Sequence, residues 1–345
     1  MKNIICIILM LCSFPVLGQS TQKEALAREV DEYVRTVNRA AAQFLNKSLS
    51  PEERIQAIKP HSILYDPKQV EQFKSVVLDE REPPEVRATA LNKIYDQVPQ
   101  DERLSRLQVE WLSNPRAPRA LRVEALNLTA NLSFSSGMGS LTEVYQKMLD
   151  DPELPFRQFA FTQLVIHGDA RAQQRLIQGL ENPESAPLPA PAAIGVLSMA
   201  VKKEYYPAVY KVLQETRDDA TRLEAIRVLG PYQEARQRLI EISQSPSQEP
   251  QFREAALGAL YSGDRENIVR YALPIVKDRN APARLRGIAI QMTIDVRQDM
   301  AYRSKVKRAD EYDRLIKSIA QDREREQSEV RSVADQYLKS VRPPA

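Results

Sequence analysis

The stretches Val86-Arg87-Ala88-Thr89-Ala90-Leu91 and Leu121-Arg122-Val123-Glu124-Ala125-Leu126 share one pattern: an arginine, two variable residues, an alanine and an apolar residue. The pattern returns along the chain at intervals of 31 to 35 residues, with a degenerate copy lacking arginine placed at 190 on Ala193-Ile194. Self-similarity at such a period is the signature of a repeat architecture. The seven complete copies begin at Arg54, Arg87, Arg122, Arg157, Arg222, Arg253 and Arg286.

Each repeat is predicted to be two helices joined by a turn. In the second helix, Val86, Ala90, Leu91 and Ile94 fall at helical spacing, which places them on one apolar face. A helix tolerates proline in its first turn but not in its interior, and prolines stand just before most of the second helices. The first helices carry apolar stripes of their own, such as Val70, Phe73, Val76 and Val77.

On these residues the chain resembles the HEAT-repeat family, in which an apolar residue and an arginine open the second helix of each antiparallel pair. The resemblance covers roughly residues 51 to 298 and includes turn acids such as Asp79, Asp151 and Asp218. Two positions depart from it, because Thr221 replaces the apolar residue before Arg222 and the copy at 190 has no arginine. The pairs that carry the resemblance are Val86-Arg87, Leu121-Arg122, Phe156-Arg157, Phe252-Arg253 and Leu285-Arg286.

The predicted fold is an all-α superhelix, a HEAT-like solenoid of about eight helical hairpins. One such hairpin cannot bury its apolar face alone, so stability requires stacking and polar caps at both ends. We expect an N-terminal capping helix within 19–50, the repeat array over 51–298 and a charged helical cap over 299–345. A final interval of 45 residues, from Arg286 to a weaker copy at Arg331, predicts an insertion or a lengthened helix. The charge run from Asp322 to Glu326 is expected to be a solvated helix face.

Residues 1–18 are predicted to be an export signal, because Lys2 is followed by an apolar run and by Val16-Leu17-Gly18. The protein is therefore expected to be exported, either to the periplasm or to the medium. No later apolar stretch is long enough to span a bilayer, which predicts no integral membrane segment in the mature chain. Cys6 and Cys12 both fall inside the signal, so no disulfide is expected.

Candidate chemistry is sparse. Without Lys2, 48 basic residues stand against 46 acidic ones, and this balance argues against a nucleic-acid partner. His61 and His167 have no His or Cys neighbour at ligand spacing, so no metal site or cofactor is predicted. The acidic pairs Asp150-Asp151 and Asp218-Asp219 could serve acid–base chemistry but stand where turn acids belong. The arginine ladder is interpreted as structural, tying neighbouring units together, although an arginine fork also suits phosphate.

A binding face can be located from the repeat register. Positions five and nine residues after each arginine are expected to point away from the packed seam, along a concave surface made by the second helices. Most of these residues are polar and few are charged. The hypothetical binding residues are Asn92, Asp96, Asn127, Asn131, Thr162, Arg227, Gln291 and Asp295.

The favoured function is an exported non-enzymatic scaffold that binds a protein or peptide along this surface. An enzyme is the first alternative, because the resemblance implies that a lyase or hydrolase site can lie in a solenoid groove, but no catalytic residues can be assigned. A nucleic-acid binder is the second alternative, and the charge balance and the export signal both disfavour it.

Overall fold

The computed structural model of the chain describes residues 20–61, 64, 66–132, 141–299 and 309–341, with the backbone alone described at 20–26, 131, 309 and 341. All of the regular elements within these ranges are helical, and no strand occurs among them. This confirms the all-α class and the packing of helices in adjacent pairs. The predicted export signal lies outside the described residues.

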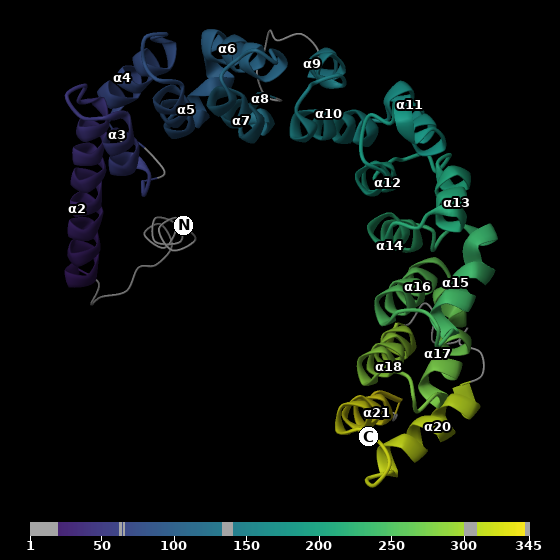
Figure 1. The fold of residues 1–345 in the computed structure, drawn as a ribbon. Coiled ribbons are helices and arrows are strands. Elements are labelled where there is room, and N and C mark those ends of the chain that lie inside the picture. The colour runs from purple at the N-terminus through teal and green to yellow at the C-terminus, as the bar shows by residue number, and fades with distance from the viewer. Residues whose placement is uncertain (1–19, 62–63, 65, 133–140, 300–308, 342–345) are drawn as a thin grey trace. The chain divides into compact units, whose positions relative to one another are not determined.

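The chain divides into two compact units, Met1–Glu153 and Leu154–Ala345. In the first unit, each of the helices α2, α4 and α6 packs against the helix that follows it, and the second helices α3, α5 and α7 also contact one another in succession (Figure 1). The described helices of this unit are α2 (Ser20–Leu45), α3 (Pro51–Ile58), α4 (Pro67–Leu78), α5 (Pro84–Lys93), the 3₁₀ helix η1 (Tyr95–Gln100), α6 (Glu102–Ser113), α7 (Arg119–Asn127), α8 (Thr129–Leu132) and α9 (Leu141–Met148).

The second unit opens on α10 (Leu154–Ile166), which packs beside the second helix α12 of the next pair. Its described pairs are α11 (Ala170–Glu181) with α12 (Ala190–Ser198), α13 (Tyr206–Glu215) with α14 (Asp219–Val228), α15 (Arg236–Gln244) with α16 (Pro250–Gly263), α17 (Ile268–Lys277) with α18 (Ala283–Gln298), and α20 (Ala309–Gln321) with α21 (Ser328–Val341). Three 3₁₀ turns join them: η2 (Pro183–Ser185), η3 (Gln233–Ala235) and η4 (Arg265–Asn267).

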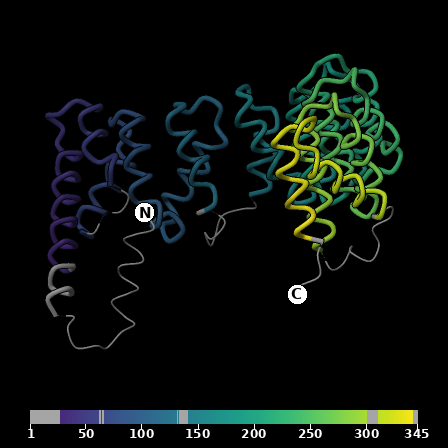
Figure 2. The backbone as a smooth tube through the Cα atoms, turned by 90° about the horizontal axis from the view of Figure 1, so that it is seen from below, coloured from purple at the N-terminus to yellow at the C-terminus, as the bar shows by residue number. Residues whose placement is uncertain are grey.

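The second helices of this unit form one continuous row, in which α12, α14, α16, α18 and α21 each contact the next. The first helices lie on the other side of the row, and Figure 2 looks along the stack, so that the helices of this unit superimpose. Seven of the alanines of the repeat pattern lie fully buried in the seam between neighbours, whereas Ala57 is half-buried. Ala90, Ala125, Ala160, Ala225, Ala256, Ala289 and Ala334 have no exposed surface, which is what the repeat spacing predicts.

Helix starts fix the register of the repeat. The second helices of the seven complete copies begin three residues before their arginine, as α5 does at Pro84 ahead of Arg87. By the same count the arginine position in α12 is Ala193, three residues later than the copy placed at 190. Pro83, Pro118, Pro189 and Pro282 occupy the N-cap, where their fixed φ ends the preceding segment. In the degenerate unit, the proline marks the register better than the Ala-Ile pair does.

The C-terminal residues continue the row. Tyr312, Ile316, Val330, Ala334 and Tyr337 are buried between α18, α20 and α21, so the weaker copy at Arg331 is a further helical pair. The expectation of a solvated helix face over Asp322–Glu326 is wrong in two respects. The run is the turn between α20 and α21, and Glu326 within it is buried.

Within the second unit, two neighbouring second helices come very close to each other where α14 and α16 end. A Cβ atom added to Gly263 would lie 1.8 Å from the backbone oxygen of Gly230, and one added to Gly230 would lie 2.2 Å from the oxygen of Ala259. Only glycine fits where two backbones come this close. By contrast, a Cβ atom added to Gly258, in the same helix, meets nothing within 4 Å.

We therefore expect Gly263→Ala to lower the free energy of unfolding by about 2 kcal/mol, because a backbone clash cannot be relieved by a side-chain rotation. The matched variant Gly258→Ala should raise it by about 0.5 to 1 kcal/mol through its effect on helix propensity. Urea unfolding followed by circular dichroism measures both. Equal effects of the two substitutions would contradict the proposed close contact.

Candidate functional site

The ladder arginines hold each pair of helices together. In four of the pairs, the arginine Nε donates to the carbonyl oxygen ten residues earlier, in the last turn of the preceding first helix. These bonds run from Arg54 to Phe44 (2.6 Å), from Arg87 to Val77 (3.0 Å), from Arg253 to Ser243 (3.1 Å) and from Arg286 to Val276 (3.2 Å). Each of them satisfies a carbonyl that the end of a helix would otherwise leave without a partner.

Three ladder arginines, two of which belong to these four, also reach forward to the turn of the next pair. Arg54 Nη1 lies 2.6 Å from Glu82 Oε2, and Arg286 Nη2 lies 2.8 Å from Glu326 Oε2. Arg222 uses an amide in place of a carboxylate and donates to Gln248 Oε1 at 2.6 Å. These three acceptors stand five residues before the next arginine of the repeat.

The other two arginines bind their neighbours differently. Arg122 is fully buried, pairs with Asp151, and lies 3.1 Å from Glu153 Oε1. Arg157 is only half-buried, and its Nε donates to the carbonyl oxygen of Pro187 at 2.7 Å. These contacts support a structural role for the ladder, with the guanidinium groups taken up by protein acceptors.

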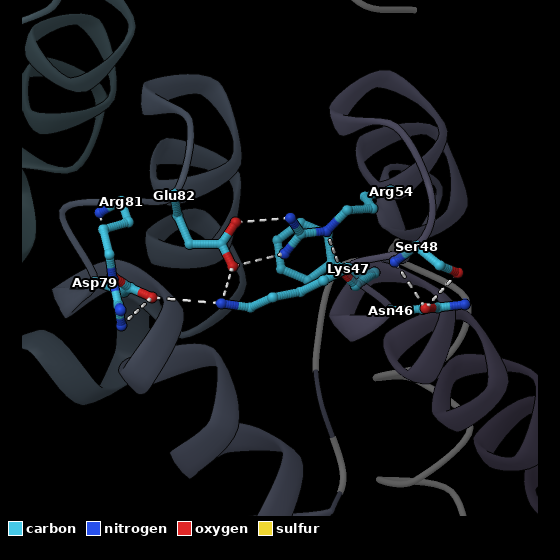
Figure 3. A network of polar contacts seen from close by, with 8 residues as sticks. Asn46, Lys47, Ser48, Arg54, Asp79, Arg81 and Glu82 are labelled. Carbon is cyan, nitrogen blue, oxygen red and sulfur yellow. Dashed lines mark hydrogen bonds and ion pairs between the residues drawn. The ribbon is translucent and has the colours of Figure 1, made fainter.

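Figure 3 shows the first of these ion pairs in its surroundings. Lys47 joins it, since its Nζ lies 3.1 Å from Glu82 Oε1 and 3.4 Å from Asp79 Oδ2. Burial raises the pKa of Glu82, but the hydrogen bonds and charges of Arg54 and Lys47 outweigh this effect and lower the pKa overall. The side chain of Arg81 is the main cause that lowers the pKa of Asp79 to about 2.

Glu326 repeats this arrangement at the other end of the array. Its burial opposes ionisation, yet the hydrogen bond and charge of Arg286 hold its pKa below the usual value. A carboxylate with a lowered folded-state pKa stabilises the protein above the unfolded-state pKa of about 4.3, and this stability is lost as pH falls through the folded-state pKa. Acid should therefore weaken the junction of α18 with α21.

We expect Glu326→Gln to lower the free energy of unfolding at pH 7 by about 3 kcal/mol, because Arg286 would stay buried without a counter-charge. The variant should also lose less stability than the parent protein between pH 5 and pH 3. Glu324→Gln, at an exposed position of the same turn, is the matched control and should change neither quantity. Urea unfolding at the two pH values gives the comparison, and a parent-like pH dependence in Glu326→Gln would contradict the assignment.

The predicted binding residues are distributed over both units. In the first, Asn92 is half-buried and donates to Glu124 of α7 at 2.7 Å, whereas Asn127 is exposed at the end of α7. Asp96 is exposed, but it lies in η1, because α5 ends at Lys93. Asn131 lies in the separate short helix α8, and its side chain is outside the described residues.

In the second unit, Arg227, Gln291 and Asp295 are exposed on the row of second helices. Gln291 donates to Asp295 Oδ1 at 2.9 Å within α18, and Arg227 pairs with Glu224 at 2.6 Å within α14. Thr162 is half-buried and donates to the carbonyl oxygen of Gln158 in its own helix. At offset five, Asn127, Arg227 and Gln291 are exposed, whereas Asn92 and Thr162 are half-buried. Offset nine runs past the end of the shorter helices.

Two hollows in the first unit are lined by charged residues. One, of about 200 Å³, lies between α4 and η1 and is crossed by the ion pair of Lys74 with Asp101. The other is an open depression of about 770 Å³ that includes Asp79, Arg81 and Arg103. In the described part of the chain, the carboxyl groups whose pKa departs from its usual value all shift downward, whereas a general acid requires an upward shift.

The remaining candidates have structural partners. His167 Nδ1 lies 2.7 Å from the carbonyl oxygen of Gln163 at the end of α10, and His61 packs edge-on against Tyr33. Asp218 caps α14 by accepting from the backbone N–H of Thr221. Within the described residues, no group of three or more His, Cys, Asp or Glu side chains could hold a metal ion.

Three polar features escaped the sequence reasoning. Lys93 is buried and donates to the carbonyl oxygens of Lys59 and His61. The Tyr337 hydroxyl donates to Asp313 and accepts from Arg297, and this network ties α18 to α20 and α21. The third feature is the acceptor five residues before Arg87, Arg253 and Arg331, and this shared offset is a signal that the sequence does carry.

Comparison with known proteins adds no relative. No family model matches the chain, and no curated protein shows significant similarity to it. Among the described residues, no helix combines the length and the apolar character that crossing a membrane requires.

Proposed function

We propose that the protein is an exported, non-enzymatic scaffold of HEAT-like repeats that binds a protein or peptide along the row of second helices. The observation that carries this proposal is that the row has two kinds of polar side chain, one buried and bonded within the fold and the other exposed. The buried arginines are occupied by acceptors of the fold, while Arg227 and Gln291 point to solvent from corresponding positions of α14 and α18. A stack of helices with regularly spaced exposed side chains suits an extended partner.

Further features support the individual parts of the proposal. The buried arginine in the first turn of the second helix, preceded by proline, is the feature in which the chain resembles HEAT repeats. Lys2 and the apolar residues after it support export. A net charge near zero supports a protein partner over a nucleic acid. Downward-shifted carboxyl pKa values suit ion pairs better than acid–base catalysis.

The double variant Arg227→Glu with Gln291→Glu tests whether the row of second helices is the binding face. The mature chain is immobilised, its partner is captured from the extracytoplasmic fraction of the source organism, and the affinity for the purified partner is measured. We expect the double variant to weaken binding about tenfold or more, because two like charges would be added to the contact surface.

Arg238→Glu is the matched control, since Arg238 forms a comparable surface pair with Glu241 but lies on the first helix α15. It should leave the affinity unchanged. Undiminished binding by the double variant would exclude the row of second helices as the binding face.

A further inference from the structure

A second surface of the Leu154–Ala345 unit has unusual chemistry. Among the described residues, five large apolar side chains are exposed, and three of them lie where α10 and α12 end. Ile166 is 44% exposed, Met199 is 54% exposed and Val201 is 77% exposed. Because α10 and α12 pack side by side, these residues belong to one edge, which connects each pair of helices to the next.

The fold does not require apolar side chains at this edge. Ile166 stands nine residues after the arginine of α10. At the same offset, α16 and α18 have the polar residues Ser262 and Asp295, both exposed. Within the described part of residues 154–345, exposed large apolar side chains at this edge are therefore confined to two successive repeats. Exposed apolar side chains that gather in this way mark interaction sites more often than isolated ones do.

Two cations adjoin the apolar residues. Lys202 and Lys203 are exposed and form no ion pair with any described carboxylate. Lys203 Nζ donates to the carbonyl oxygen of Ser198 at 3.1 Å and lies 5.6 Å from the centre of the Tyr205 ring. Both charges thus remain available to a carboxylate from outside the chain.

A tyrosine cluster extends the surface toward the next pair of helices, α13 and α14. The Tyr206 ring lies 4.6 Å from that of Tyr205 and 5.4 Å from that of Tyr232, which in turn lies 5.9 Å from Tyr210. Tyr206, Tyr210 and Tyr232 are half-buried, so each presents part of its ring to solvent. Rigid, partly exposed tyrosines are frequent anchors of protein interfaces.

We propose that Ile166, Met199, Val201, Lys202 and Lys203, here named the connector patch, bind a protein segment that presents apolar side chains next to carboxylates. The two unpaired lysines supply the charge complementarity, and the tyrosine cluster borders the contact. A lipid surface fits less well, because lipid-binding segments gather four to eight basic residues, whereas here the exposed Glu204 follows the two lysines directly. The connector patch lies where α10 and α12 end, whereas Arg227 and Gln291 lie within α14 and α18, and the proposal for the patch does not rest on the proposed binding face.

The first test uses 8-anilinonaphthalene-1-sulfonate, a probe that combines an apolar ring system with a negative charge. We expect the native mature chain to enhance its fluorescence. The double variants Met199→Ser with Val201→Ser, and Lys202→Gln with Lys203→Gln, should each reduce that enhancement at least twofold. Tyr95→Ser is the matched control, because Tyr95 is an exposed apolar side chain beside the acidic Asp96, and it should retain the signal. Equal fluorescence for all variants would refute the patch.

The second test identifies the class of partner. A photo-crosslinking p-benzoylphenylalanine replaces Val201 in the mature chain, which is irradiated in the native extracytoplasmic fraction, and the crosslinked peptide is sequenced by mass spectrometry. We expect a segment with apolar and acidic residues, and at least a fivefold loss of the adduct on Lys202→Glu with Lys203→Glu. Circular dichroism spectra and thermal midpoints are measured to check that the variants remain folded.

Two outcomes would overturn the proposal. One is a crosslinked segment without carboxylates, or an adduct that is insensitive to the lysine reversal. The other is sedimentation of the protein with phosphatidylglycerol vesicles that is lost on Val201→Ser, which would assign the surface to lipid. Crosslinking from position 291 reports on the row of second helices in the same sample, so failure at one surface is distinguishable from failure at the other.

Discussion

A buried guanidinium group between successive helical pairs is the constraint from which the remaining features follow. Arginine cannot lose its charge, so each buried copy needs acceptors within the protein. The fold supplies one acceptor from behind, a carbonyl at the end of the first helix, and one from ahead, a side chain in the next turn. Arg286 shows both, with Val276 on one side and Glu326 on the other. Where both acceptors are present, as at Arg54 and Arg286, the arginine sets the distance between one pair and the next.

Units that lack the forward acceptor are stabilised by other contacts. Ala117 stands where a carboxylate would face Arg87, and the guanidinium group of Arg87 lies 5.1 Å from the centre of the Trp111 ring instead. At α12 the arginine itself is missing. There the segment before the helix is held against α11, where a Cβ atom added to Gly179 would approach Pro187 Cδ to 2.8 Å. Close packing of a glycine against a proline-rich turn thus takes the place of an ion pair.

The sequence predicts helix class, pairing and the alanine seam well, because these depend on local periodicity and on a residue type repeated at fixed spacing. It predicts helix ends less well. The helix α5 ends at Lys93 and is followed by a 3₁₀ turn containing Pro99, so Asp96 is not on the helix where the offset rule put it. Glu326 was assigned to a solvated run because it is the last residue of a continuous run of charged residues. Glu326 stands five residues before Arg331, as Glu82 stands five residues before Arg87, and this shared spacing in the sequence is the signal that identifies it.

The connector patch lies beside the one repeat of the array that lacks the ladder arginine. Its most exposed residues, Met199 and Val201, follow α12, the helix with Ala193 at the arginine position. Sequences that depart from the rule of their own repeat are where functional residues are expected to accumulate, because such departures oppose local consistency. The degenerate unit is therefore better understood as a specialised position within the array than as a decayed copy.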